Sequence, residues 1–188
     1  MKWSIFFVMV INSNTMKRLG INVYNQKSLP ILYQSTEHII PYSLFNQKKD
    51  GNYWMNMISC DKYTNSIRTD YRIGDPITYK DLFLEYQTMN LSKLSSNLMI
   101  LSPTKPYKVV VDATGNVSGV LDRCQRIFYP SLEADMGLIS RSIIGMLYKY
   151  PFLYGNLDRI VSNVRLLENY YNLPESDLEI SRQNLIKL

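Results

Sequence analysis

The feature that most limits how this chain can fold is an apolar stripe between Pro130 and Pro151. Its members recur at steps of three and four residues, which places them on one face of a helix: Leu132, Met136, Ile139, Ile143, Met146, Leu147 and Tyr150. The pattern predicts a long helix from 131 to 150. Gly137 and Gly145 lie within it, and each costs about 1 kcal/mol of helix stability relative to alanine. We therefore expect another backbone to approach this helix closely.

Two further helices are expected after Pro151. Asn156 is a suitable N-cap for a helix running to Tyr171, with apolar residues on one face. Ser176 and Glu179 have the spacing of a capping box and predict a short tail helix that ends at Ile186. Residues 131–188 are therefore expected to form a helical hairpin plus a short tail helix.

A small antiparallel sheet is predicted just before these helices. Tyr107–Asp112 contains three consecutive valines, as a buried central strand does. Thr114-Gly115-Asn116 turns the chain, Val117–Leu121 returns, and Arg123–Tyr129 continues the sheet. With the apolar run Asn97–Leu101, we expect a three-stranded meander over 97–129.

The amino-terminal part is expected to be irregular and rich in short strands. The candidate strands are Ile21–Tyr24, Ile31–Gln34, Tyr53–Ser59 and Ile67–Ile73, with a hairpin turn at Lys48-Lys49-Asp50-Gly51. A helix with Thr78 and Asp81 in its first turn is expected to reach about Asn90. The apolar run Trp3–Ile11 is too short to span a bilayer and lacks a signal-cleavage pattern, so we expect no membrane span.

These elements predict an α+β fold in one domain, 1–188. We expect an N-terminal arm at 1–16, a part that is mostly β and loop at 17–130, and a helical part at 131–188. The apolar fraction of 46% and the charged fraction of 20% are those of a globular chain with a real core.

Side chains that commonly carry catalysis are sparse and scattered. Cys60 and Cys124 lie far apart, and with the single histidine, His38, they cannot complete a tetrahedral zinc site. The eight glycines form no phosphate-binding or dinucleotide-binding motif. We therefore expect no enzyme activity, no metal and no cofactor.

One segment keeps a catalytic alternative open. In Tyr107–Leu121 an apolar strand ends in Asp112 and is followed by a Gly/Thr turn and a second strand. This order is similar to the opening of ribonuclease H-like nucleases and resolvases, and that resemblance implies Asp112 as a Mg²⁺ ligand. Such a site needs more carboxylates from later strands, which the helical pattern after residue 130 does not provide. A hairpin-shoulder aspartate bonded to turn amides is the alternative.

Positive charge is concentrated in the amino-terminal part of the chain. The formal net charge of +5 divides into +6 over residues 1–108 and −1 over residues 109–188. Basic residues alternate with aromatic ones, a combination typical of RNA or single-strand contact. The candidate nucleic-acid-binding residues are Lys17, Arg18, Lys48, Lys49, Tyr53, Trp54, Arg68 and Arg72. The alternative is that Tyr53 and Trp54 are core residues and the lysines are merely solvated.

The 15 tyrosines favour an interaction role, since tyrosine is enriched at protein interfaces. Five are expected at an interface of the helical hairpin: Tyr148, Tyr150, Tyr154, Tyr170 and Tyr171. We expect a non-catalytic structural subunit of a large assembly that binds copies of itself and other subunits. The first expectation is a phage virion component such as a head–tail connector, ring or minor capsid protein. The alternatives are an RNA-binding subunit of an organellar (mitochondrial) ribosome or other ribonucleoprotein, and a Mg²⁺-dependent nuclease at Asp112.

Overall fold

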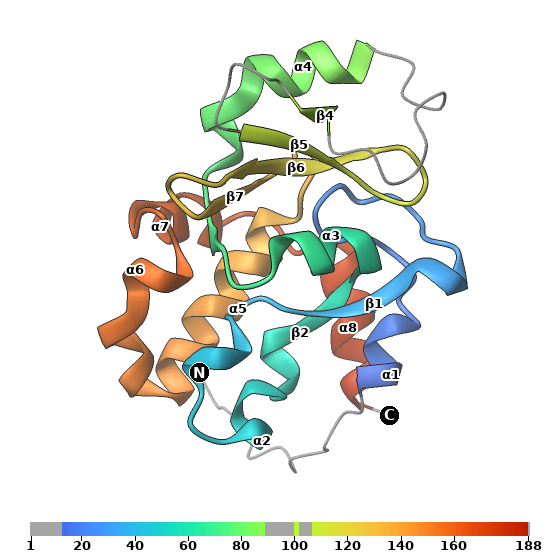
Figure 1. The fold of residues 1–188 in the computed structure, drawn as a ribbon. Coiled ribbons are helices and arrows are strands. Elements are labelled where there is room, and N and C mark those ends of the chain that lie inside the picture. The colour runs from blue at the N-terminus through green and yellow to red at the C-terminus, as the bar shows by residue number, and fades with distance from the viewer. Residues whose placement is uncertain (1–12, 89–99, 102–106, 188) are drawn as a thin grey trace.

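A computed structural model describes residues 13–88, 100–101 and 107–187, which form the α+β fold that the sequence predicts. Two sheets are present (Figure 1). The smaller pairs β1 (Gln34–His38) with β2 (Met57–Asp61). The larger has the order β3-β7-β6-β5-β4: β3 (Arg72–Ile73), β7 (Ile127–Pro130), β6 (Val117–Asp122), β5 (Tyr107–Val111) and β4 (Ile100–Leu101).

Helices surround both sheets. The α-helices are α1 (Ser13–Lys17), α2 (Lys48–Gly51), α3 (Lys62–Arg68), α4 (Lys80–Thr88), α5 (Met136–Lys149), α6 (Leu157–Ile160), α7 (Arg165–Tyr171) and α8 (Asp177–Lys187). Short 3-10 helices are η1 (Ile31–Tyr33), η2 (Tyr42–Leu44), η3 (Trp54–Asn56), η4 (Pro76–Tyr79) and η6 (Pro151–Asn156). Within the described residues, no helix is long and apolar enough to cross a membrane. The arm expected at 1–16 lies mostly outside the described residues.

The predicted meander forms the centre of the larger sheet, with more strands than expected. β4, β5, β6 and β7 are antiparallel in succession, and β3 joins β7 in parallel. Gly119 of β6 is required by close packing, because a Cβ there would lie 2.5 Å from the Phe128 ring and from the Tyr129 carbonyl oxygen. The first three residues of the expected strand 97–101 lie outside the described part of the chain.

Helices cover both faces of this sheet, so the fold has three layers in this region (Figure 1). On one face, Phe83 of α4 packs against Val109 and Val120. On the other face, Val110 and Phe128 belong to the larger core, which also holds the apolar stripe of α5. The alternating faces of β5 therefore supply both cores, as its consecutive valines predict.

The predicted helix over 131–150 begins later, at Met136. Ser131 continues the line of β7, since its N–H donates to the Ser118 carbonyl at 2.9 Å. Asp135 is the N-cap and accepts the Leu138 N–H at 3.0 Å. The close approach expected at the two glycines is made by side chains rather than by a backbone: a Cβ at Gly145 would lie 2.8 Å from the Met55 sulfur.

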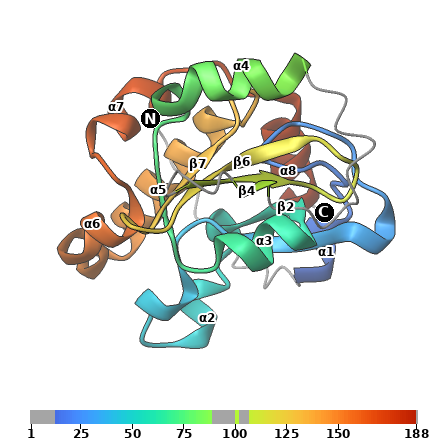
Figure 2. The same ribbon diagram turned by 45° about the horizontal axis from the view of Figure 1, so that its top comes forward.

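The helix expected from Asn156 to Tyr171 is interrupted. After α6, Val161 becomes extended and bridges Ile73 of β3 in parallel, and the Ser162 N–H donates to the Ile73 carbonyl at 2.8 Å. Sheet pairing therefore outweighs helix propensity at this point. The chain then forms α7, which packs against α5. Both views place α6 and α7 on one side of the molecule, away from β1 and α1 (Figure 1, Figure 2).

The tail helix is confirmed, together with one half of its capping box. The Glu179 N–H donates to Ser176 Oγ at 3.1 Å, as the spacing predicts. The Glu179 carboxylate does not reach back to the cap residue. It forms an ion pair with Arg141 of α5, whose Nε lies 2.9 Å from Glu179 Oε1, so this pair fixes α8 against α5.

Several strands expected before residue 75 are wrong in type. Ile67–Ile73 is the end of α3 followed by β3, because the Asp61 carboxylate caps α3 by accepting the Tyr63 and Thr64 N–H groups at 2.9 Å. Lys48–Gly51 is the short helix α2 rather than a hairpin turn. Ile31–Gln34 is η1 followed by the start of β1, and Tyr53–Ser59 is η3 followed by β2.

The remaining differences in this part of the chain are smaller. Ile21–Tyr24 forms a single bridge, between Ile21 and Ser28, rather than a strand. The helix expected from Thr78 begins with η4, which Asp75 caps, and the described part of α4 ends at Thr88.

A buried ion pair connects α3 to the smaller sheet. Arg68 and Glu37 are each 1% exposed, and their side chains form an ion pair. Arg68 also donates to the His38 carbonyl at 2.8 Å and to the Ile39 carbonyl at 2.7 Å, and the Tyr24 hydroxyl donates to Glu37 at 2.9 Å. Burial raises the pKa of Glu37 above its usual range, and the Arg68 charge opposes this effect.

Candidate functional site

The structure brings aromatic side chains from two distant parts of the sequence together. Phe45, Tyr53 and Trp54 flank α2 and begin η3, whereas Tyr150 and Phe152 follow α5. The ring centroids of Tyr53 and Tyr150 lie 6.3 Å apart, those of Phe45 and Tyr150 5.8 Å apart, and those of Tyr150 and Phe152 6.0 Å apart. We call these five residues the aromatic cluster. Most of its ring pairs are close to perpendicular, the edge-to-face arrangement that aromatic rings favour.

One lysine contacts the aromatic cluster, and two more lie next to its members in sequence. Lys149 Nζ lies 4.4 Å from the centre of the Tyr53 ring, a cation–π distance. Lys48 and Lys49 are exposed on α2, between Phe45 and Tyr53 in sequence. Burial, and then the nearby Asp50 carboxylate, raise the pKa of Tyr150 to about 12. We call the aromatic cluster with these three lysines the aromatic–lysine surface. It joins residues from two separate predicted sets, the basic–aromatic set and the interface tyrosines.

The other interface tyrosines differ in exposure. Tyr148 is 87% exposed and Tyr154 56% exposed, on either side of Tyr150 in sequence. Tyr171 is 44% exposed at the end of α7. Tyr170 is half-buried, and its hydroxyl donates to Asp75 at 2.8 Å. Burial and this hydrogen bond raise the pKa of Tyr170, so its hydroxyl has a structural partner within the chain.

The remaining candidate nucleic-acid-binding residues are dispersed. Lys17 ends α1 and is half-buried, and Arg18 follows it, exposed. Arg68 lies in the interior in its ion pair with Glu37, and there it has no access to a phosphate. Arg72 of β3 lines a groove together with residues of α6 and α7. Its guanidinium donates to the Asp158 carbonyl at 3.0 Å and to the Gln125 carbonyl at 3.3 Å.

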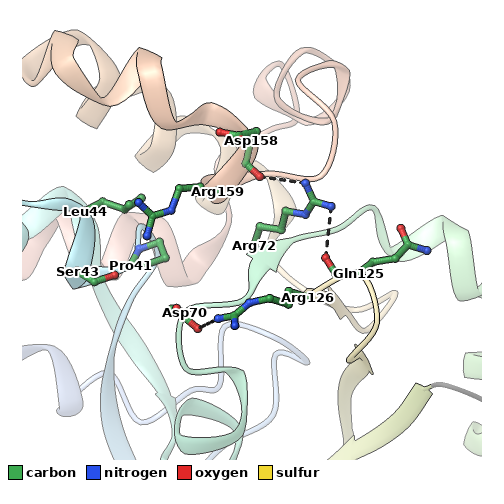
Figure 3. A pocket seen from close by; sticks show the side chains of 9 residues that line it. All are labelled: Pro41, Ser43, Leu44, Asp70, Arg72, Gln125, Arg126, Asp158 and Arg159. Carbon is green, nitrogen blue, oxygen red and sulfur yellow. Dashed lines mark hydrogen bonds and ion pairs between the residues drawn. The ribbon is translucent and has the colours of Figure 1, made fainter.

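That groove contains arginines that the sequence analysis did not single out. Arg126 lies in the turn between β6 and β7, Arg159 in α6 and Arg165 in α7. Together with Arg72 they line two hollows of about 430 and 410 Å³, which share Arg72 and Gln125. Figure 3 shows the first of them, with Arg72, Arg126 and Arg159. We call this the arginine groove. No sequence pattern indicates it, because its members come from four separate elements.

The side chain of Asp112 is hydrogen-bonded to residues of the turn that follows it. Its carboxylate is fully buried and accepts the Thr114 N–H at 2.8 Å, the Thr114 hydroxyl at 2.7 Å and the Asn116 N–H at 3.0 Å on one oxygen. The other oxygen accepts Asn25 Nδ2 at 2.7 Å. Both oxygens therefore have protein donors, as expected of a structural aspartate at a hairpin shoulder. Within the described residues, His, Cys, Asp and Glu form no group of three that could hold a metal ion.

The other nucleophile and base candidates also have ordinary surroundings. Cys60 is buried, and burial raises the pKa of its thiol well above the usual value. Cys124 is an exposed free thiol in the turn before β7. His38 Nε2 is 2.9 Å from the Asn52 amide oxygen, and its ring lies edge-on to Tyr42. These side chains do not converge on a common point in the part of the chain described.

Comparison with known protein families, with curated proteins and with solved structures finds no match to this chain.

Proposed function

We propose that this protein is a non-catalytic structural subunit of a large assembly, and that it docks onto a neighbouring copy through the aromatic–lysine surface. The observation that carries the proposal is the exposure of Phe152, which belongs to that surface, and of Tyr148 and Tyr154, which are its neighbours in sequence: 44%, 87% and 56%. Exposed aromatic side chains are typical of protein interfaces, where they bury large areas at low entropic cost.

Charge favours a head-to-tail contact. Two copies that met through the same face would bring Lys48, Lys49 and Lys149 against one another, and like charges at an interface are unfavourable. The neighbouring copy should therefore present a different, acidic face. The exposed carboxylates of Glu168 and Glu175, on and after α7, are candidates for it. Heterologous contacts of this kind generate rings when the rotation closes.

This geometry suits a virion component such as a connector, ring or minor capsid protein. Residue usage is compatible with that assignment, because the chain has only two alanines, Ala113 and Ala134, and many Asn, Ile, Leu, Ser and Tyr residues. This usage is that of an AT-rich genome, such as that of a virus, a phage, an organelle or an AT-rich bacterium. A virion is the location that we propose first.

Light scattering on the purified chain at low and high salt tests the contact. We expect a multimer that Tyr148→Ser/Tyr154→Ser dissociates. The matched control is Ile31→Ser/Leu32→Ser, which removes another exposed apolar pair, 84% and 81%, from η1. A wild-type monomer at every concentration, or equal dissociation by both double variants, would contradict the proposal.

Charge reversal separates a head-to-tail contact from any other. Lys48→Glu/Lys49→Glu should dissociate the multimer, because it places acid against acid. Adding Glu168→Lys/Glu175→Lys on the same chain should restore it, because both sides of the contact then have reversed sign. Failure of the four-fold variant to reassemble would leave the docking surface in place and assign the acidic side to other residues.

The second candidate function is an RNA-binding subunit of an organellar ribosome or other ribonucleoprotein. The observation that favours it is Lys149 over the Tyr53 ring with Lys48 and Lys49 nearby, since phosphate-binding lysines beside aromatic rings are typical of RNA contacts. A monomer that co-purifies with nucleic acid, read from the 260/280 nm absorbance ratio, and that releases it in high salt would establish this function instead.

A further inference from the structure

We propose that the arginine groove binds the phosphate groups of a nucleotide or a nucleic-acid strand. This inference does not rest on the docking contact proposed above, because the groove and the aromatic–lysine surface share no residue. It adds an anion-binding site to a chain whose formal charge is only +5.

The groove comprises two hollows whose linings share Arg72 and Gln125. The first is lined by Arg72, Arg126 and Arg159, whose side chains surround it from β3, from the turn between β6 and β7, and from α6 (Figure 3). The second is lined by Arg72 and Arg165. Because Arg72 belongs to both, an anionic chain could place one phosphate in each hollow and contact Arg72 from both.

Among the residues that the structure describes, three of the four arginines have no carboxylate partner. Arg72 donates only to the backbone carbonyls of Asp158 and Gln125, and its Nε is buried with no hydrogen-bond partner among the described residues. Arg159 and Arg165 are exposed and form no ion pair within the described ranges. Only Arg126 is paired, with Asp70 at 2.7 Å. A bound anion would supply the missing partners.

The donors around the arginines favour phosphate over carboxylate. Gln125, Ser162, Asn163 and Asn169 line the second hollow, and each has a neutral hydrogen-bond donor. A phosphate offers more acceptor oxygens than a carboxylate, so it can accept from a guanidinium fork and from neutral donors together.

Three aspartates, Asp70, Asp75 and Asp158, reduce the positive charge of the groove. The remaining net charge of the lining is small. Binding should therefore depend on guanidinium contacts at short range and should weaken steeply with salt.

The test is fluorescence anisotropy of a labelled poly-dT oligonucleotide at low salt, with a nucleoside diphosphate and polyglutamate as competitors. Arg159→Gln/Arg165→Gln removes two exposed, unpaired arginines and leaves the fold intact. We expect it to weaken binding about tenfold or more. The slope of log affinity against log salt should fall by about 1.4, since each single-strand phosphate contact contributes about 0.7. The matched control, Lys48→Gln/Lys49→Gln, removes two charges outside the groove and should bind as wild type does.

Competition distinguishes the sources of the phosphate. Displacement by the diphosphate at concentrations near those of the oligonucleotide assigns the groove to a nucleotide, whereas displacement only by longer strands assigns it to a nucleic acid. Three results would overturn the proposal: no binding by the wild type at low salt, equal displacement by polyglutamate, or loss of binding in the lysine control with retention in the arginine variant. The last result would move nucleic-acid contact to the aromatic–lysine surface.

Discussion

Replacing Arg68 by methionine should destabilise the fold by about 3–5 kcal/mol, because it leaves a buried carboxylate without its charged partner. The Glu37 side chain is 1% exposed, and in the variant it keeps only the hydrogen bond from Tyr24, at 2.9 Å. The carbonyls of His38 and Ile39 also lose the donors that now lie at 2.8 and 2.7 Å, and each loss costs about 1 kcal/mol. Since domains of this size are stable by about 5–15 kcal/mol, the variant should fold only marginally.

The loss of stability in Arg68→Met should depend on pH. Burial already raises the pKa of Glu37, and the positive charge of Arg68 opposes that rise. Without Arg68 the folded-state pKa of Glu37 rises further above its unfolded value of about 4.3. A raised folded-state pKa gives stability that is present below the unfolded pKa and lost as pH rises through the folded one. The variant should therefore lose more stability at pH 8 than at pH 5.

Urea unfolding followed by circular dichroism at both pH values measures these free energies. The matched control is Arg126→Met, which removes an exposed ion pair with Asp70 at 2.7 Å and should cost less than about 1 kcal/mol. Adding Glu37→Leu to Arg68→Met should recover part of the loss, because it removes the unpaired charge. The reasoning would be refuted if Arg68→Met cost no more than Arg126→Met, or if its cost were the same at pH 5 and pH 8.

Three more predictions concern single sites. Gly119→Ala should destabilise by about 1–3 kcal/mol in thermal unfolding, whereas Gly155→Ala, whose new Cβ meets nothing within 4 Å, should be neutral or slightly stabilising. Because the pKa of Tyr150 is raised to about 12, the contribution of its hydroxyl to the free energy of unfolding should be present below pH 10 and lost between pH 10 and 12. In Tyr150→Phe the free energy of unfolding should fall less over this pH range. Cys124 should react with a thiol reagent in the native protein, whereas Cys60 should react only on unfolding; equal rates would contradict the burial of Cys60.

Local patterns predicted the elements whose stability is local. The α5 stripe, the Ser176 cap of α8 and the valine-rich strand β5 all have short-range causes, and the structure confirms them. The strand prediction for Ile67–Ile73 is wrong because the alternation of apolar and polar residues there was a weaker determinant than the capping of α3 by Asp61. The prediction of a long helix after Asn156 is wrong because Val161 pairs with Ile73. A local sequence pattern cannot reveal a partner that lies so far away in the sequence.

The candidate surfaces also divide into parts set by neighbours in sequence, which could be predicted, and parts set by distant contacts, which could not. Lys48, Lys49, Tyr53 and Trp54 are neighbours in sequence, so their proximity could be predicted. The contact of Tyr53 with Tyr150 could not be predicted, because it depends on how α5 lies against η3. The arginine groove was not predictable at all, since the pairing that interrupts the C-terminal helix also brings its arginines together.

The position of β3 also constrains when this protein can fold during translation. Ile73 pairs with Phe128 on one side and with Val161 on the other, and both partners are translated long after it. A ribosome-bound chain that has exported only its first half therefore holds β3 with both hydrogen-bonding edges open. Such contacts between distant residues slow folding and expose strand edges to association in the meantime. A nascent chain should gain protection on both edges of β3 only after residue 161 has left the ribosomal exit tunnel.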